Sequence, residues 1–488
     1  MLYDSATESS ASGASFSLAC IARANTIPNG SKNPFFISQL FILQKYTNKK
    51  QRTITTYSDC YPAAYPKDLF YLCGMTHNTS NNSPGTSVFD CIVIGGGISG
   101  ISFAYQAANS GDSVLVLEAE KSVGGQIDTF APKRYPDFWT ELGAHTCYNS
   151  YTRLLSIVTD SALQRDLLPL DKCSYILHNG RHLKSVASQL SYLPLIAHGW
   201  RMFSFSREGK TVKQAFRPVV GASNYDKLFR RLFRAVICQD ADEYPAVFFL
   251  KKRKERNKEM PRKYSFSKGL SSLLQAMTEK GGFSVRTNSG AAKVTLADGI
   301  YSVETSAGET FRSRNIALAT NPQIASQLTA DIEPEVSARL KTIGLFESEA
   351  MTVIVDKDRL TLQKVAGIIP VSDEFLSAVS RDAAEHPRLR GFTFHFYKGQ
   401  KTETEKLRLI RTVLNIDEKD ILETAAKLHV LPSPRLEHTD IIEQVEALRR
   451  QKHTFFLGNY YYGLSLEDCI HRSADECARY RAANRASV

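Results

Sequence analysis

Glycines at fixed spacing follow an apolar run near residue 88, and they are the first residues that suggest chemistry. Gly95-x-Gly97-x-x-Gly100 comes directly after "FDCIVI" and opens "ISGISFAYQAANSG", which has helical spacing. The first glycine permits a tight turn, the second lets a pyrophosphate approach the backbone, and the third lets helix and strand pack closely. The helix start at Ile98 and Ser99 would offer free N–H groups to phosphates. This pattern predicts a dinucleotide site, with a glycine-rich turn that holds no ligand as the alternative.

An acidic residue stands where such a site needs one. In the next stretch, "SVLVLEAE", the apolar run is followed by Glu118 and Ala119. The Glu118 carboxylate can accept hydrogen bonds from ribose hydroxyls. The two strands and the intervening helix therefore form one predicted βαβ unit, and "FSVRT" with "GIYSVETSAGETFRSRNIALAT" predicts further strands joined by a hairpin.

A second glycine-containing stretch lies close to the C-terminus. "FFLGNYYYGLSLEDCIHRSADECARY" carries Gly458, Asn459 and Gly463 ahead of a helical pattern. Ser465-x-x-Asp468 has capping-box spacing, which predicts a helix that starts at Leu466. Free N–H groups at such a helix start can stabilise negative charge.

The stretch after Glu118 suggests which dinucleotide is bound. "LEAEKSVGGQIDTF" continues into Gly124 and Gly125, and it resembles the extended flavin fingerprint of the glutathione-reductase-like FAD superfamily, in its amine oxidase and protoporphyrinogen oxidase branch. The resemblance implies FAD as the cofactor, with the paired glycines close to its phosphates and ribityl chain. That branch usually carries a basic residue after the glycines, whereas Gln126 stands here.

Further stretches resemble the same family in the same order along the chain. "ELGAHTCYNSYTRLLSIVTDSAL" implies that the backbone at Gly143 and Ala144 passes beside the flavin, and "YSFSKGLSSLLQAM" implies the helix before an adenine-side backbone at 285–294. "NIALATNP" resembles a strand-to-linker exit. The resemblance also implies that Leu464, Ser465 and Leu466 face the flavin pyrimidine ring. The "GN-x-x-x-G" stretch, with His438 before it, resembles protoporphyrinogen oxidases more than monoamine oxidases.

The resemblance implies an α/β fold with a discontinuous, glutathione-reductase-like FAD-binding Rossmann domain and an inserted α+β substrate domain. The FAD-binding domain is expected to comprise residues 86–150, 264–330 and 438–488. Residues 151–263 and 331–437 are expected to form the substrate-binding, partly helical region.

The implied activity is dehydrogenation of a hydrophobic substrate, most like the oxidation of protoporphyrinogen IX to protoporphyrin IX in tetrapyrrole biosynthesis. The hydride would pass to FAD and then to oxygen or another acceptor, so no catalytic side chain is assigned. A carotenoid-type desaturase or a flavin amine oxidase is the alternative enzyme. A non-catalytic flavin- or lipid-binding scaffold is the alternative from another class.

Composition limits the partners and the compartment. The 488-residue chain has a net charge of +11, which suits an anionic membrane or an acidic ligand, with a basic surface that has no dedicated partner as the alternative; it shows no nucleic-acid-binding motif. Nine dispersed cysteines without zinc-ligand spacing predict free thiols in a reducing compartment, no metal site and a buried Cys91. No apolar run is long enough to span a bilayer. We therefore expect a cytoplasmic protein, or one peripheral on a membrane that faces a reducing compartment, in an oligomeric state that the sequence leaves open.

Three other stretches have less specific patterns. "LSYLPLIAHGWRMFSFS" (190–206) is apolar and aromatic; core packing is favoured over a pocket lining or a membrane contact. "KKRKERNKEMPRK" (251–263) holds eight basic residues and is interpreted as a solvated loop, with attraction of anionic lipid or substrate carboxylates as the alternative. In "GFTFHFYKG", Phe394 and Phe396 alternate as in a strand and are predicted to share a face with a flat substrate.

Residues 1–85 differ in composition from the rest of the chain. They are rich in Ser, Thr, Asn and Pro and show no periodicity. They are interpreted as a disordered or targeting extension: a dispensable segment ahead of a start at Met75, an organelle-targeting segment within residues 1–74, or a functional extension.

Overall fold

The computed structural model describes residues 88–180 and 182–485. The predictions about residues 1–85, including a start at Met75 and organelle targeting by residues 1–74, lie outside the described residues.

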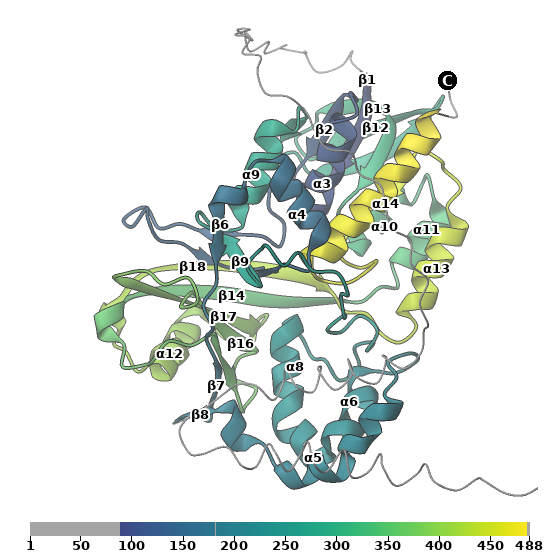
Figure 1. The fold of residues 1–488 in the computed structure, drawn as a ribbon. Coiled ribbons are helices and arrows are strands. Elements are labelled where there is room, and N and C mark those ends of the chain that lie inside the picture. Colours follow the sequence, from purple (N-terminus) through teal and green to yellow (C-terminus); the bar gives the residue numbers. More distant parts are fainter. Residues whose placement is uncertain (1–87, 181, 486–488) are drawn as a thin grey trace, which may run out of the picture. The chain divides into compact units, whose positions relative to one another are not determined.

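The first sheet contains the predicted βαβ unit. Its seven strands run in the order β10-β2-β1-β13-β12-β11, and β19 pairs with β13 (Figure 1). The strands are β1 (Val88–Ile94), β2 (Val114–Leu117), β10 (Ser284–Arg286), β11 (Ala291–Ala297), β12 (Ile300–Thr305), β13 (Thr310–Leu318) and β19 (Thr454–Phe456). β10, β2, β1, β13 and β19 are parallel, while β11 and β12 are added as antiparallel hairpins. The predicted βαβ unit and hairpin are confirmed.

Helices cover both faces of this sheet, which explains why its central strands are apolar at consecutive positions. Cys91 and Val93 point into one core and Ile92 and Ile94 into the other. The first core is completed by α3 (Ile98–Ala108), α4 (Thr152–Asp160), α9 (Ser271–Lys280) and α14 (Leu466–Arg485). The second is completed by α10 (Pro322–Thr329), α11 (Pro334–Leu340) and α13 (His438–Leu448). Cys91 is fully buried, as predicted.

The second sheet is almost entirely antiparallel, in the order β18-β14-β17-β16-β15-β7-β8, with β7 and β15 as its parallel pair. Its strands are β7 (Tyr175–His178), β8 (Leu183–Ser185), β14 (Leu345–Asp356), β15 (Gly367–Pro370), β16 (Ser377–Ser380), β17 (Leu389–Tyr397) and β18 (Ile421–Pro432). α12 (Glu403–Leu414) packs on one face, in a core with Phe392, Phe394 and Phe396. The prediction that Phe394 and Phe396 face a flat substrate is therefore wrong, because both rings are fully buried on the α12 side.

The other face of the second sheet lies against the segment that follows the paired glycines. Thr393 Oγ donates to the Glu141 carbonyl at 2.7 Å, and Thr352 Oγ lies 3.0 Å from Thr140 Oγ. Two small sheets order this segment: β3 (Thr129–Phe130) with β4 (Thr140–Glu141), and β5 (Cys147–Tyr148) with β9 (Lys263–Phe266) and β6 (Leu167–Pro169). Because side chains alternate along β17, one face of the strand packs against α12 and the other face is directed at residues 138–145.

Short helices form a separate group between β8 and β9. They are α5 (Tyr192–His198), α6 (Val212–Val220), α7 (Ala222–Asn224), the π-helix η5 (Tyr225–Phe229) and α8 (Arg230–Ile237). The 3-10 turns along the chain are η2 (Gln164–Asp166), η3 (Val186–Gln189), η4 (Gly199–Ser204), η6 (Lys357–Arg359) and η7 (Glu418–Asp420). No side chain of α5 or η4 is buried. The favoured interpretation of residues 190–206 as core packing is thus wrong.

Within residues 88–180 and 182–485, none of the helices combines the length and apolarity that crossing a bilayer requires. The same residues contain six free cysteines and no His, Cys, Asp or Glu cluster arranged to hold a metal ion.

Candidate functional site

The carboxyl ends of four parallel strands meet at one edge of the first sheet. Ala319 N donates to the Ile94 carbonyl and Leu457 N donates to the Leu318 carbonyl, both at 2.8 Å. Gly95 N donates to the Leu117 carbonyl at the same distance. In open parallel sheets, ligands bind at this edge. The predicted residues at Gly95, Glu118 and Gly458 therefore share one edge although they are far apart in sequence.

Two glycine loops pack directly on each other there. Gly124 N donates to the Gly96 carbonyl at 3.0 Å, and Gly97 pairs with Gly124 in an isolated bridge. Gly125 has φ +59°, and a Cβ on it would lie 3.1 Å from the Gly97 Cα. The predicted pair Gly124–Gly125 and the β1–α3 turn thus form one cradle. If these glycines were replaced by residues with side chains, the side chains would fill it.

The three glycines of the turn have different surroundings. A Cβ on Gly95 would lie 2.7 Å from the Ala319 carbonyl oxygen, and one on Gly100 only 2.0 Å from the Gly95 oxygen. A Cβ on Gly97 would meet nothing closer than the Gly125 Cα, at 3.7 Å. Gly95 and Gly100 therefore serve packing, whereas the space beside Gly97 is open to a ligand.

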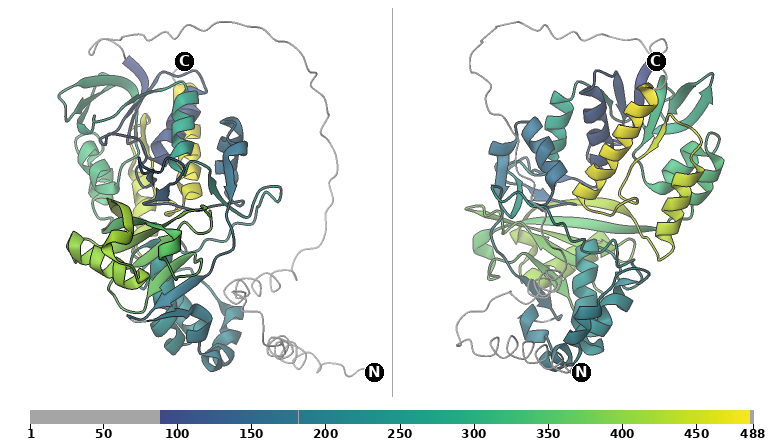
Figure 2. Two further views of the ribbon diagram at one scale, coloured as in Figure 1. Left: turned by 90° about the vertical axis from the view of Figure 1, so that its left-hand side faces the viewer. Right: turned by 45° about the vertical axis from the view of Figure 1, so that its right-hand side comes forward.

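α3 begins at this open space without a side-chain cap. Gly97 is its N-cap residue, and no side-chain cap hydrogen bond is made at the first turn, which includes Ile98 and Ser99. The positive end of the helix dipole and the N–H groups of the first turn are therefore available to an anion. α14 lies beside α3 (Figures 1 and 2), and Ser473 Oγ donates to the Ser99 carbonyl at 2.8 Å.

Glu118 closes one side of the cradle. Its carboxylate accepts from Gly96 N at 2.6 Å and from Glu120 N at 2.8 Å, and its side chain is buried. Ala119 is exposed next to it and lies against Gly290, while Ser289 N donates to the Glu118 carbonyl. The stretch 285–294 therefore lies beside Ala119, where the sequence predicts an adenine-side backbone.

Gln126 links the cradle to the second sheet. Ala144 N donates to the Gln126 carbonyl at 3.2 Å, and a Cβ on Gly143 would lie 2.0 Å from that oxygen. The Gln126 side chain donates to the Val430 carbonyl at 3.2 Å and presents its oxygen to His429 Nδ1 at 2.7 Å. Gly143 and Ala144 are thereby held beside Gln126 and remain partly exposed.

The C-terminal stretch reaches the same edge. Ser465 Oγ accepts from Asp468 N at 3.1 Å and donates to the Asp468 carboxylate at 2.6 Å, which confirms the predicted helix start at Leu466. Gly458 has φ +133° and approaches the Thr320 carbonyl. Asn459, Leu464 and Ser465 are partly exposed in this loop. His438 Nε2 lies 2.6 Å from the Tyr460 carbonyl and so fixes the loop from α13.

The basic segment 251–263 is anchored at its start on this helix end. Arg253 donates to Ser465 Oγ at 2.7 Å and to Asp468 at 3.0 Å, and its guanidinium lies over the Tyr151 ring. Lys251 donates to the Tyr462 carbonyl and lies 3.7 Å from Asp468. Lys251 and Arg253 are thus bound at the start of α14. The interpretation of this segment as a solvated loop did not predict these contacts.

Three histidines beside Gly143 were not predicted from the sequence. His145 follows Ala144, His395 lies on β17 and His429 on β18. His395 Nδ1 lies 3.3 Å from Ser377 Oγ, and His429 Nε2 lies 2.8 Å from the Leu142 carbonyl. Only the register of the second sheet, which pairs Ala350 with His395 and Ser348 with His429, reveals this histidine cluster.

Burial keeps these histidines neutral. It lowers the pKa of His395 to about 3, with smaller contributions from His429 and His145. Burial also lowers the pKa of His145 and of His429, although hydrogen bonds to the Gly143 and Leu142 carbonyls oppose the shift. At neutral pH the lowered pKa values therefore favour the uncharged form of the imidazoles in this histidine cluster.

Comparison with known proteins assigns the family. A model of the flavin containing amine oxidoreductases matches residues 98–427, which is more than half of the chain. The chain belongs to the flavin-containing amine oxidoreductase family. Its cofactor is FAD.

Relatives within this family include oxidases of two kinds. Protoporphyrinogen oxidase 1, chloroplastic, of Spinacia oleracea is 22% identical over 478 residues, which span 80% of this chain and 84% of that protein. A flavin-containing amine oxidase of Oncorhynchus mykiss is 24% identical over 283 residues, which span 51% of this chain and 53% of that protein. A crystal structure of a proposed protoporphyrinogen oxidase from Exiguobacterium sp. superposes with a TM-score of 0.65 at 15% identity, over 82% of this chain and 100% of the other. The mixed α/β fold is thus that of the FAD-dependent amine oxidase and protoporphyrinogen oxidase structures.

The cradle fits FAD. Gly97 leaves room for a pyrophosphate, the uncapped first turn of α3 offers N–H donors, and the Glu118 carboxylate can accept from ribose hydroxyls. When bound, FAD supplies the hydride acceptor of the reaction. The residues of the cradle would bind and orient it, and the histidine cluster lies near Gly143.

Proposed function

We propose that this protein is an FAD-dependent dehydrogenase of a hydrophobic substrate and that protoporphyrinogen IX is that substrate. Three features support the proposal: the cradle described above, the histidine cluster, and the long similarity to the spinach protoporphyrinogen oxidase, which spans most of both chains.

In this proposal FAD lies along the edge of the first sheet. Its pyrophosphate rests on the β1–α3 turn and the paired glycines, its adenosine ribose on Glu118 and Ala119, and its pyrimidine ring on the α14 helix start. The proposed contacts are with Gly95, Gly97, Ile98, Ser99, Gly100, Glu118, Ala119, Gly124, Gly125, Gln126, Gly143, Ala144, Gly458, Asn459, Gly463, Leu464, Ser465 and Leu466.

We propose the glutathione-reductase-like arrangement for this domain, assembled from residues 86–150, 264–330 and 438–488. The support is that each of these three segments contributes strands to the first sheet. α4 packs in the same core as α3 and α14, so we include Thr152–Asp160 in this domain. The remainder of 151–263 and 331–437 holds the second sheet and the short helices, and we assign the substrate to it.

The charge of the substrate side is the observation that carries the choice of substrate. The second sheet directs Ser377, Thr393, His395, Lys427 and His429 toward the Gly143 side, and the two carboxyl groups near them are already engaged, Asp128 by Lys427 and Glu141 by Thr129 Oγ and Leu270 N. Lys427 is paired with Asp128 at 2.8 Å. Such a surface suits an apolar macrocycle with carboxylate side arms better than an ammonium group, which favours an acidic counter-charge.

The same geometry gives the chain a role in proton transfer. Dehydrogenation of a C–H bond in protoporphyrinogen requires that one hydride leaves with its electron pair and that one proton leaves a pyrrole nitrogen. A neutral imidazole of the histidine cluster can accept that proton. We place His395 in this role because it lies on β17, on the face opposite α12; since burial lowers its pKa to about 3, it would hold the proton only transiently before passing it on.

An oxidation assay tests the proposal. Porphyrin fluorescence should appear faster with the FAD-loaded protein than with a Gly97→Ala variant without FAD, which measures the spontaneous oxidation of porphyrinogen in air. Parallel oxygen-consumption assays with a primary amine and with a polyene test the amine oxidase and desaturase alternatives. Turnover of the amine with no acceleration of porphyrinogen oxidation would contradict the proposal.

The scaffold alternative requires a separate test, because a binding protein can also hold FAD. After photoreduction under nitrogen, the bound flavin should be reoxidised on admission of air. A flavin that stays reduced in air and is not reduced by any of the three substrates would favour a non-catalytic scaffold.

A further inference from the structure

Two side chains of the basic segment 251–263 are directed at the loop that precedes α14. Lys251 Nζ lies 3.8 Å from the position that a Cβ on Gly463 would take, and Arg253 binds Ser465 Oγ. The side chains of Lys251 and Arg253 are 28% and 23% exposed, whereas the other six basic residues of the segment are classed with the exposed surface. We call Lys251 and Arg253 the basic clamp.

The basic clamp is held in place on both sides along the chain. After it, Asn257 N donates to the Asn149 carbonyl and Asn149 Nδ2 donates to the Asn257 carbonyl, both at 2.9 Å. Before it, the Phe248 ring lies 5.2 Å from Lys251 Nζ and packs edge-on against the His438 ring. The two cations are therefore fixed at the α14 helix start by contacts on either side of them.

The basic clamp brings more positive than negative charge to this helix start. The Asp468 carboxylate faces both cations, at 3.7 Å from Lys251 and 3.0 Å from Arg253. The neighbouring Glu467 is engaged elsewhere, because its carboxylate accepts from Leu154 N in the first turn of α4 at 3.1 Å. Two cations thus share one carboxylate, which leaves one positive charge uncompensated beside the loop.

We propose that Lys251 and Arg253 are positioning residues that raise the reduction potential of the bound FAD. The inference rests on the proposed function above, which places the pyrimidine ring of FAD at the α14 helix start. A hydride adds two electrons and one proton to the oxidised ring, and the ring is left with one negative charge, shared by N1 and the C2 carbonyl. The uncompensated charge of the basic clamp, together with the N–H groups at the helix start, stabilises this negative charge and so favours reduction.

The midpoint potential of the bound flavin tests the inference without any substrate. It is measured during anaerobic photoreduction against a reference dye. Lys251→Met and Arg253→Met should each lower the equilibrium constant for reduction about tenfold, as expected for one partly buried unit charge near the ring; for a two-electron couple this is a shift of about 30 mV. Lys251→Arg and Arg253→Lys keep the charge and should retain most of the potential.

Sulfite gives a second measurement that also needs no substrate. It adds to N5 of the oxidised ring and leaves a negative charge on the pyrimidine portion. The Kd for sulfite should therefore rise about tenfold in both methionine variants. Titration with FAD shows that each variant still binds the cofactor.

Asp468→Asn separates an electrostatic role from a structural one. This change removes the carboxylate that offsets the basic clamp, so it should raise the potential and tighten sulfite binding, in the direction opposite to the methionine variants. A basic clamp that only held the loop in shape would instead give shifts of the same sign in all three variants.

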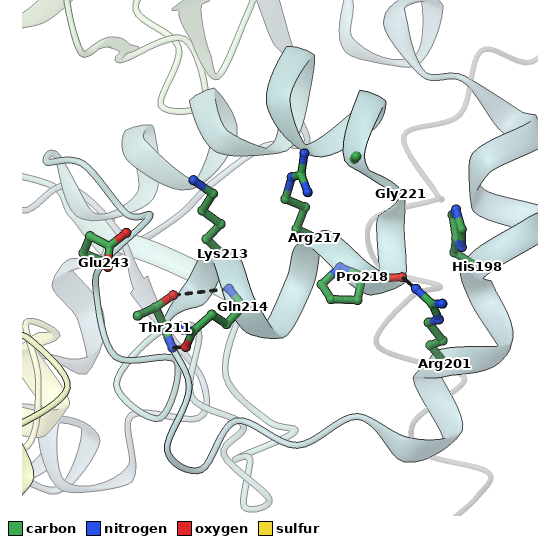
Figure 3. A pocket seen from close by; sticks show the side chains of 10 residues that line it. His198, Arg201, Thr211, Lys213, Gln214, Arg217, Pro218, Gly221 and Glu243 are labelled. Carbon is green, nitrogen blue, oxygen red and sulfur yellow. Dashed lines mark hydrogen bonds between the residues drawn. The ribbon is translucent and has the colours of Figure 1, made fainter.

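Arg201→Met is the matched control, because it removes one cation elsewhere in the chain. Arg201 lies over the Trp200 ring and donates to the Pro218 carbonyl at 3.4 Å, in a hollow between η4 and α6 (Figure 3). The net charge changes as much as in Arg253→Met, but the α14 helix start is untouched. The potential and the Kd for sulfite should both stay unchanged.

Either of two results would overturn the inference. One is an unchanged potential in methionine variants that still bind FAD. The other is a lower potential in Asp468→Asn, and this result decides the matter even where a methionine variant fails to bind FAD. No measurement here uses a porphyrinogen or an amine, so turnover of the wrong substrate would contradict the proposed function and leave this inference standing.

Discussion

Replacement of Gly97 by alanine separates the fold from cofactor binding. Gly97 has φ −75° and ψ 178°, which alanine adopts without strain, and the new methyl would meet nothing nearer than 3.7 Å. A glycine-to-alanine change at a compatible position stabilises a protein by about 0.4–1 kcal/mol. We therefore expect apoprotein Gly97→Ala to be at least as stable as the unchanged apoprotein.

The effect on FAD should be opposite. The methyl occupies the space where we place the pyrophosphate, so the phosphate must move away from the first turn of α3. Loss of one charge-assisted hydrogen bond costs about 1.5–3 kcal/mol, which corresponds to a roughly 10- to 150-fold higher Kd. Titration of the apoprotein with FAD, followed by flavin fluorescence, measures the Kd, and unfolding in urea measures the stability.

Gly100→Ala is the matched control, since it adds the same methyl three residues later. That methyl would lie 2.0 Å from the Gly95 carbonyl oxygen, so the apoprotein itself should lose about 1–3 kcal/mol of stability through overpacking. The reasoning would be refuted if Gly97→Ala bound FAD with an unchanged Kd, or if it destabilised the apoprotein as much as Gly100→Ala.

Three further predictions concern the surroundings of the site. His429→Ala removes the imidazole that contacts Gln126 and Leu142, so the Kd for FAD should rise about 5- to 30-fold, at about 1 kcal/mol per lost hydrogen bond; an unchanged Kd in the same titration would show that this contact does not position Gln126. Glu476→Ala removes the carboxylate that lies 2.7 and 3.0 Å from the buried Arg449 and Arg472 and leaves them only Glu446, at 3.1 and 2.6 Å, among the described carboxylates. Urea unfolding should therefore show a loss near the lower end of the about 3–5 kcal/mol that breaking a buried ion pair costs; a loss under 1 kcal/mol would contradict the buried-charge argument. Burial raises the pKa of Glu141 to about 8, so its contribution to stability is fully present below the pKa of the unfolded chain and is lost as the pH rises toward 8; Glu141→Gln should flatten the pH dependence of the urea midpoint between pH 5 and 8, and an equally steep profile would count against this assignment.

The sequence was sufficient for features that depend on short stretches. The β1–α3 turn, the acid at Glu118 and the capped start of α14 each follow from residues within a few positions of one another. Their glycines and caps are required by backbone geometry, which is why they are visible without a structure.

Features that depend on strand register could not be predicted in this way. Gln126 and His429 are 303 residues apart, and a shift of one residue in β18 would turn His429 to the other face. The same reasoning explains the error at Phe394: alternation predicted a shared face correctly, but α12 covers that face. Residues 190–206 were misassigned because apolar composition alone does not distinguish a core helix from an exposed patch.

The most direct measurement is the reduction of bound FAD by substrate in the absence of oxygen. On rapid mixing of the FAD-loaded protein with protoporphyrinogen IX, the long-wavelength absorbance of oxidised flavin should bleach and porphyrin absorbance should appear in the same phase. Primary amines should leave the spectrum unchanged. Bleaching by an amine while protoporphyrinogen IX has no effect would contradict the account.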